Sequence, residues 1–199
     1  MKSFLVKYGL VAVALGGFYL YSSFNSDGLS SVDEEIDLNA VLDVTIDTLY
    51  SYQESIEGQE NDDPDAAMLG FSEVLADSYN TSEPALFKTA LGVEPRSDAS
   101  LLAYEDTNGN RMMDESEAGI FLIEIDGERS RIIASSRSGA VNDHHFSGTG
   151  LLTGYLIGSM LSRQRMAGVS SDSLAKKQPV TARAAAKARA GSGSHSKGK

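Results

Sequence analysis

The sequence predicts an α+β protein with an N-terminal transmembrane helix, a small acidic domain, a glycine-striped apolar helix and a disordered basic tail. Three observations predict this: an uncharged apolar run near the N-terminus, a change in apolar period near residue 95, and charge that gathers in three blocks. The acidic domain is expected to hold two to three helices followed by a short antiparallel β meander. We place the four parts at residues 1–27, 28–145, 146–165 and 166–199.

The first part predicts a membrane anchor. Lys2 and Lys7 precede an uncharged run over residues 8–26. As a helix this run would extend about 28 Å, close to the roughly 30 Å of a bilayer's hydrocarbon core. A cleaved secretory signal is the alternative, with small residues at 14–16 as its cleavage site. The apolar run continues through Tyr21, in the manner of an interfacial aromatic belt, and this favours a retained anchor.

The charge blocks predict the topology. Residues 1–24 carry two lysines and no acid, residues 25–145 carry 27 acids against six bases, and residues 146–199 carry nine bases against one acid. The positive-inside bias places the N-terminus in the cytoplasm and the acidic domain in the periplasm, at a bacterial inner membrane. The chain has no cysteine, which excludes disulfides, thiolate metal sites and a lipid-attached cysteine.

Periodicity predicts the elements of the acidic domain. Apolar side chains recur with the helical period in two segments, and a serine cap adds a third, shorter helix, so we expect helices over 32–57, 64–79 and 82–91. Beyond Pro95 the period becomes two, which predicts strands over 100–105, 119–125 and 130–135. The Asp126–Gly127 pair predicts a hairpin turn between the last two strands.

An oxygen-rich stretch, DTNGNRMMDESE at residues 106–117, carries the most specific chemical signal. Its side chains follow the spacing that a hard cation needs, with predicted metal ligands Asp106, Asn108, Asn110, Asp114 and Glu117. The stretch resembles helix-loop-helix calcium loops, and also the Asp-x-Asn-Gly-Asn/Asp calcium loops of secreted bacterial proteins. Arg111 stands sixth, where helix-loop-helix loops carry glycine, and Gly109 stands fourth.

The resemblance implies calcium as the cofactor. Because the loop falls between predicted strands, calcium is expected to rigidify the domain rather than to change an interhelical angle. A polar Asx-turn that merely links two strands is the alternative.

A stripe of glycines follows the acidic domain. Residues 146–162 lack charge and place Gly150, Gly154 and Gly158 four apart, so that on a helix another backbone can approach closely. The stripe resembles the glycine zippers of small membrane proteins, which implies helix packing or self-association. A glycine-rich loop is the alternative. A 17-residue helix reaches about 25 Å, so whether this segment spans the membrane stays open. Spanning would return the basic tail to the cytoplasm, and otherwise the tail stays in the periplasm.

Other residues give weaker indications. Asp143, His144 and His145 form a second candidate metal site, but adjacent histidines point in different directions and no third ligand is near in the sequence. The chain has no nucleophile elbow, no zinc-protease pair and no nucleotide-binding loop, so we predict no enzymatic activity. The basic tail has no aromatic residues to stack on bases, which favours membrane lipids over nucleic acid as its partner.

Together these features predict a membrane-anchored envelope protein that acts as a binding, accessory or structural subunit. Its expected partners are membrane lipids and either other envelope proteins or copies of itself. A glycine-zipper membrane oligomer or pore component is the first alternative, and a degenerate enzyme is the second.

Overall fold

The computed structural model describes residues 36–57, 63–147 and 154–191. These residues form an α+β fold of five helices and one five-stranded antiparallel sheet, so the predicted fold class is confirmed at this level. The predicted anchor at residues 1–27 and Gly150 lie outside the described residues.

Two long helices begin the described fold, α2 (Leu38–Ile56) and α3 (Pro64–Thr81). Each starts after an aspartate, Asp37 or Asp63, whose carboxylate accepts hydrogen bonds from backbone N–H groups of the first turn. A proline at the first position of α3 removes an N–H that would lack a partner there. Both helices were predicted from their apolar periodicity, and the start of α3 also from Asp63 and Pro64. The predicted start of the first helix at residue 32 is wrong, because the cap at Asp37 was not recognised and α2 begins at Leu38.

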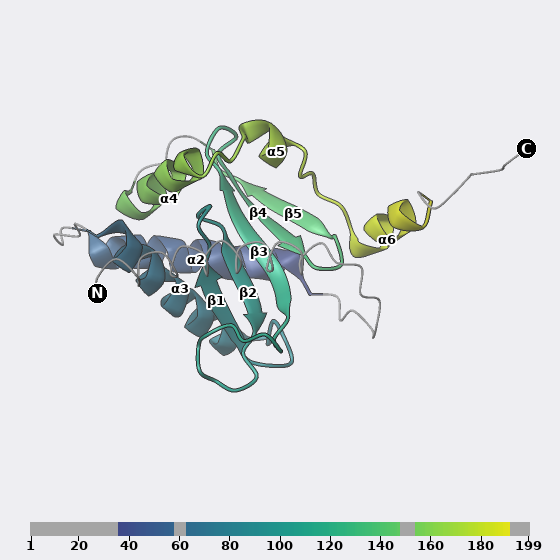
Figure 1. Cartoon of the computed structure of the whole chain (residues 1–199), viewed down its shortest axis with the longest axis horizontal. Helices are drawn as coiled ribbons and strands as arrows, with labels where there is room; N and C mark the ends of the chain where they lie inside the picture. Colours follow the sequence, from purple (N-terminus) through teal and green to yellow (C-terminus); the bar gives the residue numbers. More distant parts are fainter. Residues whose placement is uncertain (1–35, 58–62, 148–153, 192–199) are drawn as a thin grey trace, which may run out of the picture. The chain divides into compact units, whose positions relative to one another are not determined.

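The sheet is a meander in which each strand pairs with the next one in the chain (Figure 1). Its strands are β1 (Leu91–Pro95), β2 (Leu101–Glu105), β3 (Gly119–Asp126), β4 (Arg131–Ser136) and β5 (Val141–His145). The predicted turn at Asp126–Gly127 joins β3 to β4. The prediction included β2, β3 and β4, but not the two edge strands.

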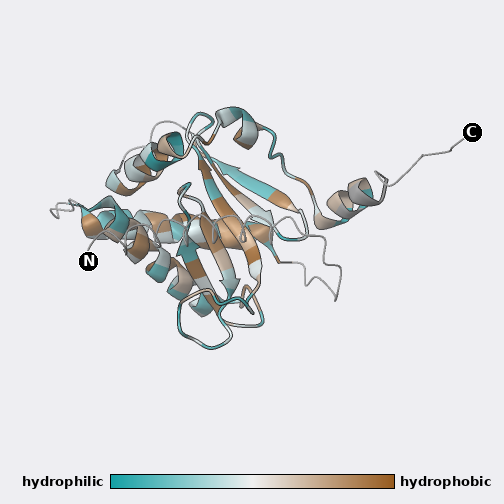
Figure 2. Cartoon of the chain, viewed as in Figure 1, coloured by the Kyte–Doolittle hydropathy of each residue, from teal (hydrophilic) through white to brown (hydrophobic). Residues whose placement is uncertain are grey.

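Helices α2 and α3 pack on one face of the sheet and on each other, where they form the core. Hydrophobic residues gather along α2 and the central strands (Figure 2). Val41, Phe71 and Leu75 of the helices are almost fully buried with Phe121 of β3. The ring of Tyr79 meets that of Phe121 edge-on, with centroids 5.3 Å apart. Each large apolar side chain buried in this way stabilises the fold by about 1.5–3 kcal/mol.

The segment between α3 and β1 differs from the prediction. Residues 82–90 form bends rather than a third helix. The amide of Asn80 pairs with both the N–H and the C=O of Leu91, at 2.8 and 2.9 Å, and so directs the chain into β1. Leu86 and Phe87 still pack against the core, as predicted for a helix. A helix this short gains too little from its own hydrogen bonds to form without further support.

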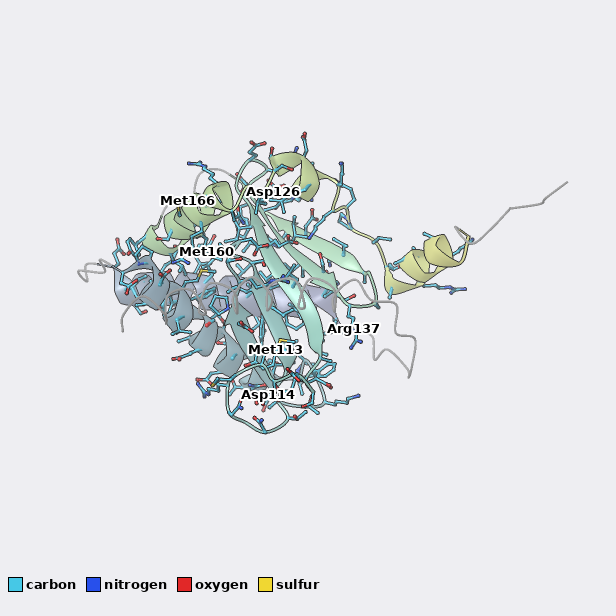
Figure 3. The ribbon with its side chains drawn as sticks, in the orientation of Figure 1. Met113, Asp114, Asp126, Arg137, Met160 and Met166 are labelled. Atoms are coloured by element: carbon cyan, nitrogen blue, oxygen red, sulfur yellow. The ribbon has the colours of Figure 1, made fainter. Side chains whose placement is uncertain are left out.

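Helix α4 (Tyr155–Met166) contributes to the same core. Leu156, Ile157 and Met160 are at most 1% exposed, whereas Met166 at the end of the helix is 78% exposed (Figure 3). Within the described part of the chain, no helix has the length and apolar character needed to cross a membrane. Among the described residues of the predicted second span, Leu156, Ile157 and Met160 face the core of the domain.

The basic tail is more ordered than the sequence predicts. It contains α5 (Ser171–Ala175) and α6 (Ala182–Gly191), so the prediction of disorder from residue 166 is wrong for these segments. Leu174 is buried, and Val180 forms a β-bridge with Val141 on the outer edge of β5. The tail lacks enough apolar residues for its own core, but it obtains contacts from the sheet. The alanines of α6 also have the highest helix propensity.

Candidate metal-binding loop

The oxygen-rich stretch is the loop that joins β2 to β3, between strands as predicted. Figure 3 labels Met113 and Asp114 within it. Two backbone hydrogen bonds close its base: Glu105 N–H donates to the Ala118 carbonyl at 3.0 Å, and Asp106 N–H donates to the Ala90 carbonyl at 2.9 Å. The sheet therefore holds both ends of the loop.

Asp106 and Glu117, the first and last predicted ligands, are buried carboxylates, each 7% exposed. The N–H groups of Asn110 and Arg111 donate to the two carboxylate oxygens of Asp106, at 3.1 and 3.0 Å. Glu117 accepts from the N–H groups of Thr107 and Asp114, at 2.9 and 3.0 Å. The loop backbone is thus folded around these two carboxylates, and its N–H groups fix them in position.

The three remaining predicted ligands form an exposed cluster in the same loop. Asn108 and Asn110 donate from their side-chain amides to Asp114 Oδ2, at 2.6 and 3.1 Å. Their amide oxygens accept backbone N–H groups, from Asn110 and from Met112. The two amide N–H groups therefore contact the Asp114 carboxylate oxygen that a bound cation would contact.

The backbone at the sixth loop position has the conformation that the motif requires. Arg111 has a φ of +59°, in the left-handed region, although glycine is the residue that usually occupies it. Gly109, two residues earlier, has a φ of +70°. The Arg111 side chain points away from the loop and pairs with Asp77 of α3 at 2.8 Å. The departure seen in the sequence therefore changes the side chain at this position but not the turn.

The loop carries a negative electrostatic field that reaches into the sheet. Burial first, and then the negative charges of Asp106, Glu117, Glu94 and Asp114, together raise the pKa of Tyr104 on β2 to about 12. Such a field favours the approach of a cation.

The donors present suit calcium by chemistry, since all five predicted ligands offer oxygen. Among the described residues, however, no three acidic, histidine or cysteine side chains converge closely enough to hold a metal ion. A calcium ion would therefore need oxygens from Asn108 and Asn110 as well as the carboxylates. The two amides would have to release Asp114 and turn their oxygens toward the ion.

The other predicted site residues lie elsewhere. Gly154 immediately precedes α4 with a φ of +154°, and a Cβ there would come within 2.7 Å of Gln53 Oε1. Gly158 lies on the exposed side of α4, with open space where a Cβ would stand. The histidines of β5 diverge: His145 Nε2 is 3.2 Å from Asp143 Oδ2, whereas the His144 ring packs against Phe146.

Sequence reasoning missed a buried ionic cluster on the opposite face of the sheet from α2. Arg131 is 1% exposed, and its guanidinium donates to Asp126 Oδ2 at 3.0 Å and to Asp143 Oδ2 at 2.5 Å. It also donates to the carbonyl oxygens of Leu174 and Lys177, at 2.8 and 3.0 Å. One available signal was the hairpin itself, since Asp126 and Arg131 face each other across its turn.

A scan against models of known protein families matches none of them, and searches of curated proteins and of solved structures find no match.

Proposed function

We propose that this chain is a bacterial envelope protein, held in the inner membrane by residues 1–27, whose acidic α+β domain binds calcium in the periplasm. It acts as a binding, accessory or structural subunit rather than as an enzyme. The observation that carries this proposal is the arrangement of Asp106 and Glu117. Both carboxylates are buried at the two ends of one loop, whose sixth residue turns in the left-handed conformation.

The geometry also supports a structural role for calcium rather than a switching role. The loop joins adjacent strands of a meander, so there is no pair of helices whose angle could change. Bound calcium would neutralise carboxylates that the fold brings together. The expected consequence is a stiffer loop and a more stable domain.

The test is a thermal unfolding titration of the full chain in detergent, with calcium added to the millimolar range. Extracellular calcium loops bind with dissociation constants of roughly 0.1–1 mM. A tenfold excess over such a constant adds about 1.4 kcal/mol to the free energy of unfolding. For a chain of this size the melting temperature should rise by about 3–6 °C.

Two variants complete the test. Asp106→Ala combined with Glu117→Ala should abolish the rise in melting temperature. Glu115→Ala is the matched control, because Glu115 is an exposed acid of the same loop outside the predicted ligand set. Calcium should raise the melting temperature of this variant as much as that of the unaltered chain. A melting temperature that calcium leaves unchanged in the unaltered chain would leave the loop as a polar turn.

The membrane anchor has its own test. The purified chain should retain Met1 or Lys2 and stay with membranes after washing with high salt and carbonate, because salt does not screen the burial of apolar residues. A mature N-terminus at Gly17 would show cleavage of a secretory signal and remove the anchor from the proposal.

A second candidate function is self-association through the glycine stripe, as a membrane oligomer or pore component. The observation in its favour is the open space beside Gly158 on the exposed side of α4. Gly158→Leu should then reduce oligomer size in detergent, measured by light scattering. We rank this function second, because the large apolar side chains Leu156, Ile157 and Met160 of α4 pack into the core of the domain.

A further inference from the structure

The residues that lead into α2 and those that lead into α6 lie next to each other in the domain. Ile36 and Asp37, which lead into α2, line one cavity of about 510 Å³ together with Val180 and Ala182, which lead into α6. Ala140 of the turn between β4 and β5 lines it as well. In Figure 1 the start of α2 and α6 appear on the same side of the sheet.

The segment that precedes α6 is tied to the sheet along its length. Arg131 holds the carbonyl oxygens of Leu174 and Lys177, and the Lys177 ammonium pairs with Glu124 of β3. Val180 and Val141 exchange two backbone hydrogen bonds, at 2.8 and 2.9 Å. These contacts fix the point from which α6 leaves the domain.

Helix α6 carries positive charge only. Arg183 and Lys187 are exposed and lie one turn apart. From Ser173 to Lys199 the chain has seven lysines and arginines and no acid. Apart from Arg183, Lys187 and Arg189, α6 consists of alanine and one glycine, so it offers no large apolar side chain for insertion into a bilayer. Its chemistry fits a surface of negative charge.

We infer that this side of the domain faces the membrane, and that α6 lies on anionic phospholipid headgroups. The inference rests on the proposed membrane anchor at residues 1–27. Eight residues, 28–35, connect that segment to Ile36 and can span at most roughly 30 Å. The root of α6, in the same cavity as Ile36, is therefore held near the bilayer, where phosphate groups attract each lysine or arginine.

Phospholipid is favoured over nucleic acid by two features. The described part of α6 has no aromatic side chain that could stack on a base. An anchored chain also presents α6 continuously to the headgroups, at a high local concentration. Binding of this kind is electrostatic, so it must weaken with salt.

The test uses the full chain reconstituted in lipid nanodiscs. Since the chain has no cysteine, Ala184→Cys on α6 gives one site for a fluorophore that acceptor lipids in the disc quench. Discs that contain phosphatidylglycerol should quench the label about twofold more than discs of phosphatidylcholine alone. The excess should vanish at about 1 M salt, where the screening length is about 3 Å. Arg183→Ala combined with Lys187→Ala should also remove it.

The matched control is a label at Ala66→Cys, an exposed position in the first turn of α3, where lipid charge should not change the quenching. Three outcomes overturn the inference. Equal quenching in both lipids, with the chain retained in the discs, leaves the anchor intact but frees α6 from the membrane. Loss of the chain from the discs overturns the anchor and the inference together. A label that responds to an added oligonucleotide but not to lipid charge assigns α6 to nucleic acid.

Discussion

Arg131 on β4 and Asp126 on β3 form an ion pair inside the protein, with Nε and Oδ2 3.0 Å apart and each residue 1% exposed. The same guanidinium reaches Asp143 on the edge strand β5 and two carbonyl oxygens of the C-terminal segment. One side chain therefore joins the central hairpin, the sheet edge and the segment that leads to α6. Its charge is balanced by two carboxylates, which would be left without a buried partner if it were removed.

Arg131→Ala should lower the free energy of unfolding by about 3–5 kcal/mol, because it removes the buried cation from two largely buried carboxylates. Urea denaturation of the full chain measures this loss. Hydrogen exchange should also accelerate over residues 174–180, since their carbonyl groups lose a donor. Arg129→Ala is the control: Arg129 is 38% exposed and 3.5 Å from the same Asp126, so its loss should cost less than about 1 kcal/mol. Equal losses for the two variants would contradict the central role of Arg131.

Helix α4 belongs to the core of the domain, which makes its inner face sensitive to truncation. Leu156 is fully buried, so Leu156→Ala should destabilise the chain by about 2–5 kcal/mol. Met166→Ala, at an exposed position of the same helix, should change stability by less than about 0.5 kcal/mol. Differential scanning calorimetry compares the two variants. If Leu156→Ala behaved like Met166→Ala, then α4 would not pack on the domain.

The sequence predicts those elements whose local signals agree with one another. Helices α2 and α3 have a cap and a periodic apolar face, and the three central strands alternate between core and opposite face. Strand β1 was missed because Gly92 and Pro95 are typical strand breakers, although both lie at a sheet edge where they are tolerated. Strand β5 was missed because its sequence, VNDHH, is polar: pairing with β4, not burial, makes it a strand.

The order of the C-terminal segment could not be predicted from its own residues. It depends on Arg131, which lies more than forty positions earlier in the chain than Leu174. The position of the oxygen-rich loop between two strands was predicted and is confirmed. Its ligand set stays a prediction, because the asparagine amides face Asp114 with their nitrogens.

Stability should fall in alkaline solution, and Tyr104 provides the reason. Its pKa in the folded chain is raised from 10 to about 12, so the folded state keeps a proton that the unfolded state has lost. The stabilisation is fully present below pH 10 and is lost as the pH rises through 12. Urea denaturation at pH 9 and pH 11 measures the loss. Tyr104→Phe should reduce it, whereas Tyr155→Phe, at an exposed position, should not. If the unaltered chain and both variants lost the same free energy of unfolding between pH 9 and pH 11, the loss would belong to other titrating groups.

The left-handed backbone at Arg111 predicts that glycine is more stabilising than alanine at this position. At a φ of +59°, a residue with a Cβ is less stable than glycine by about 1–2 kcal/mol. Arg111→Gly and Arg111→Ala both remove the exposed pair with Asp77, so the difference between the two variants isolates the backbone. The glycine variant should be the more stable by about 1 kcal/mol in urea denaturation. It should also bind calcium more tightly than the alanine variant, since its loop is better preorganised.

Met112 supplies the control, because it is exposed and is not among the described non-glycine residues with positive φ. At that position the order should reverse, with Met112→Ala more stable than Met112→Gly, since glycine there only adds freedom to the unfolded chain. Calcium affinity measured by isothermal titration calorimetry should follow the order of stabilities at position 111. If Arg111→Gly were no more stable than Arg111→Ala, the sixth residue would not turn as a calcium loop requires, and the main support for the metal site would be lost.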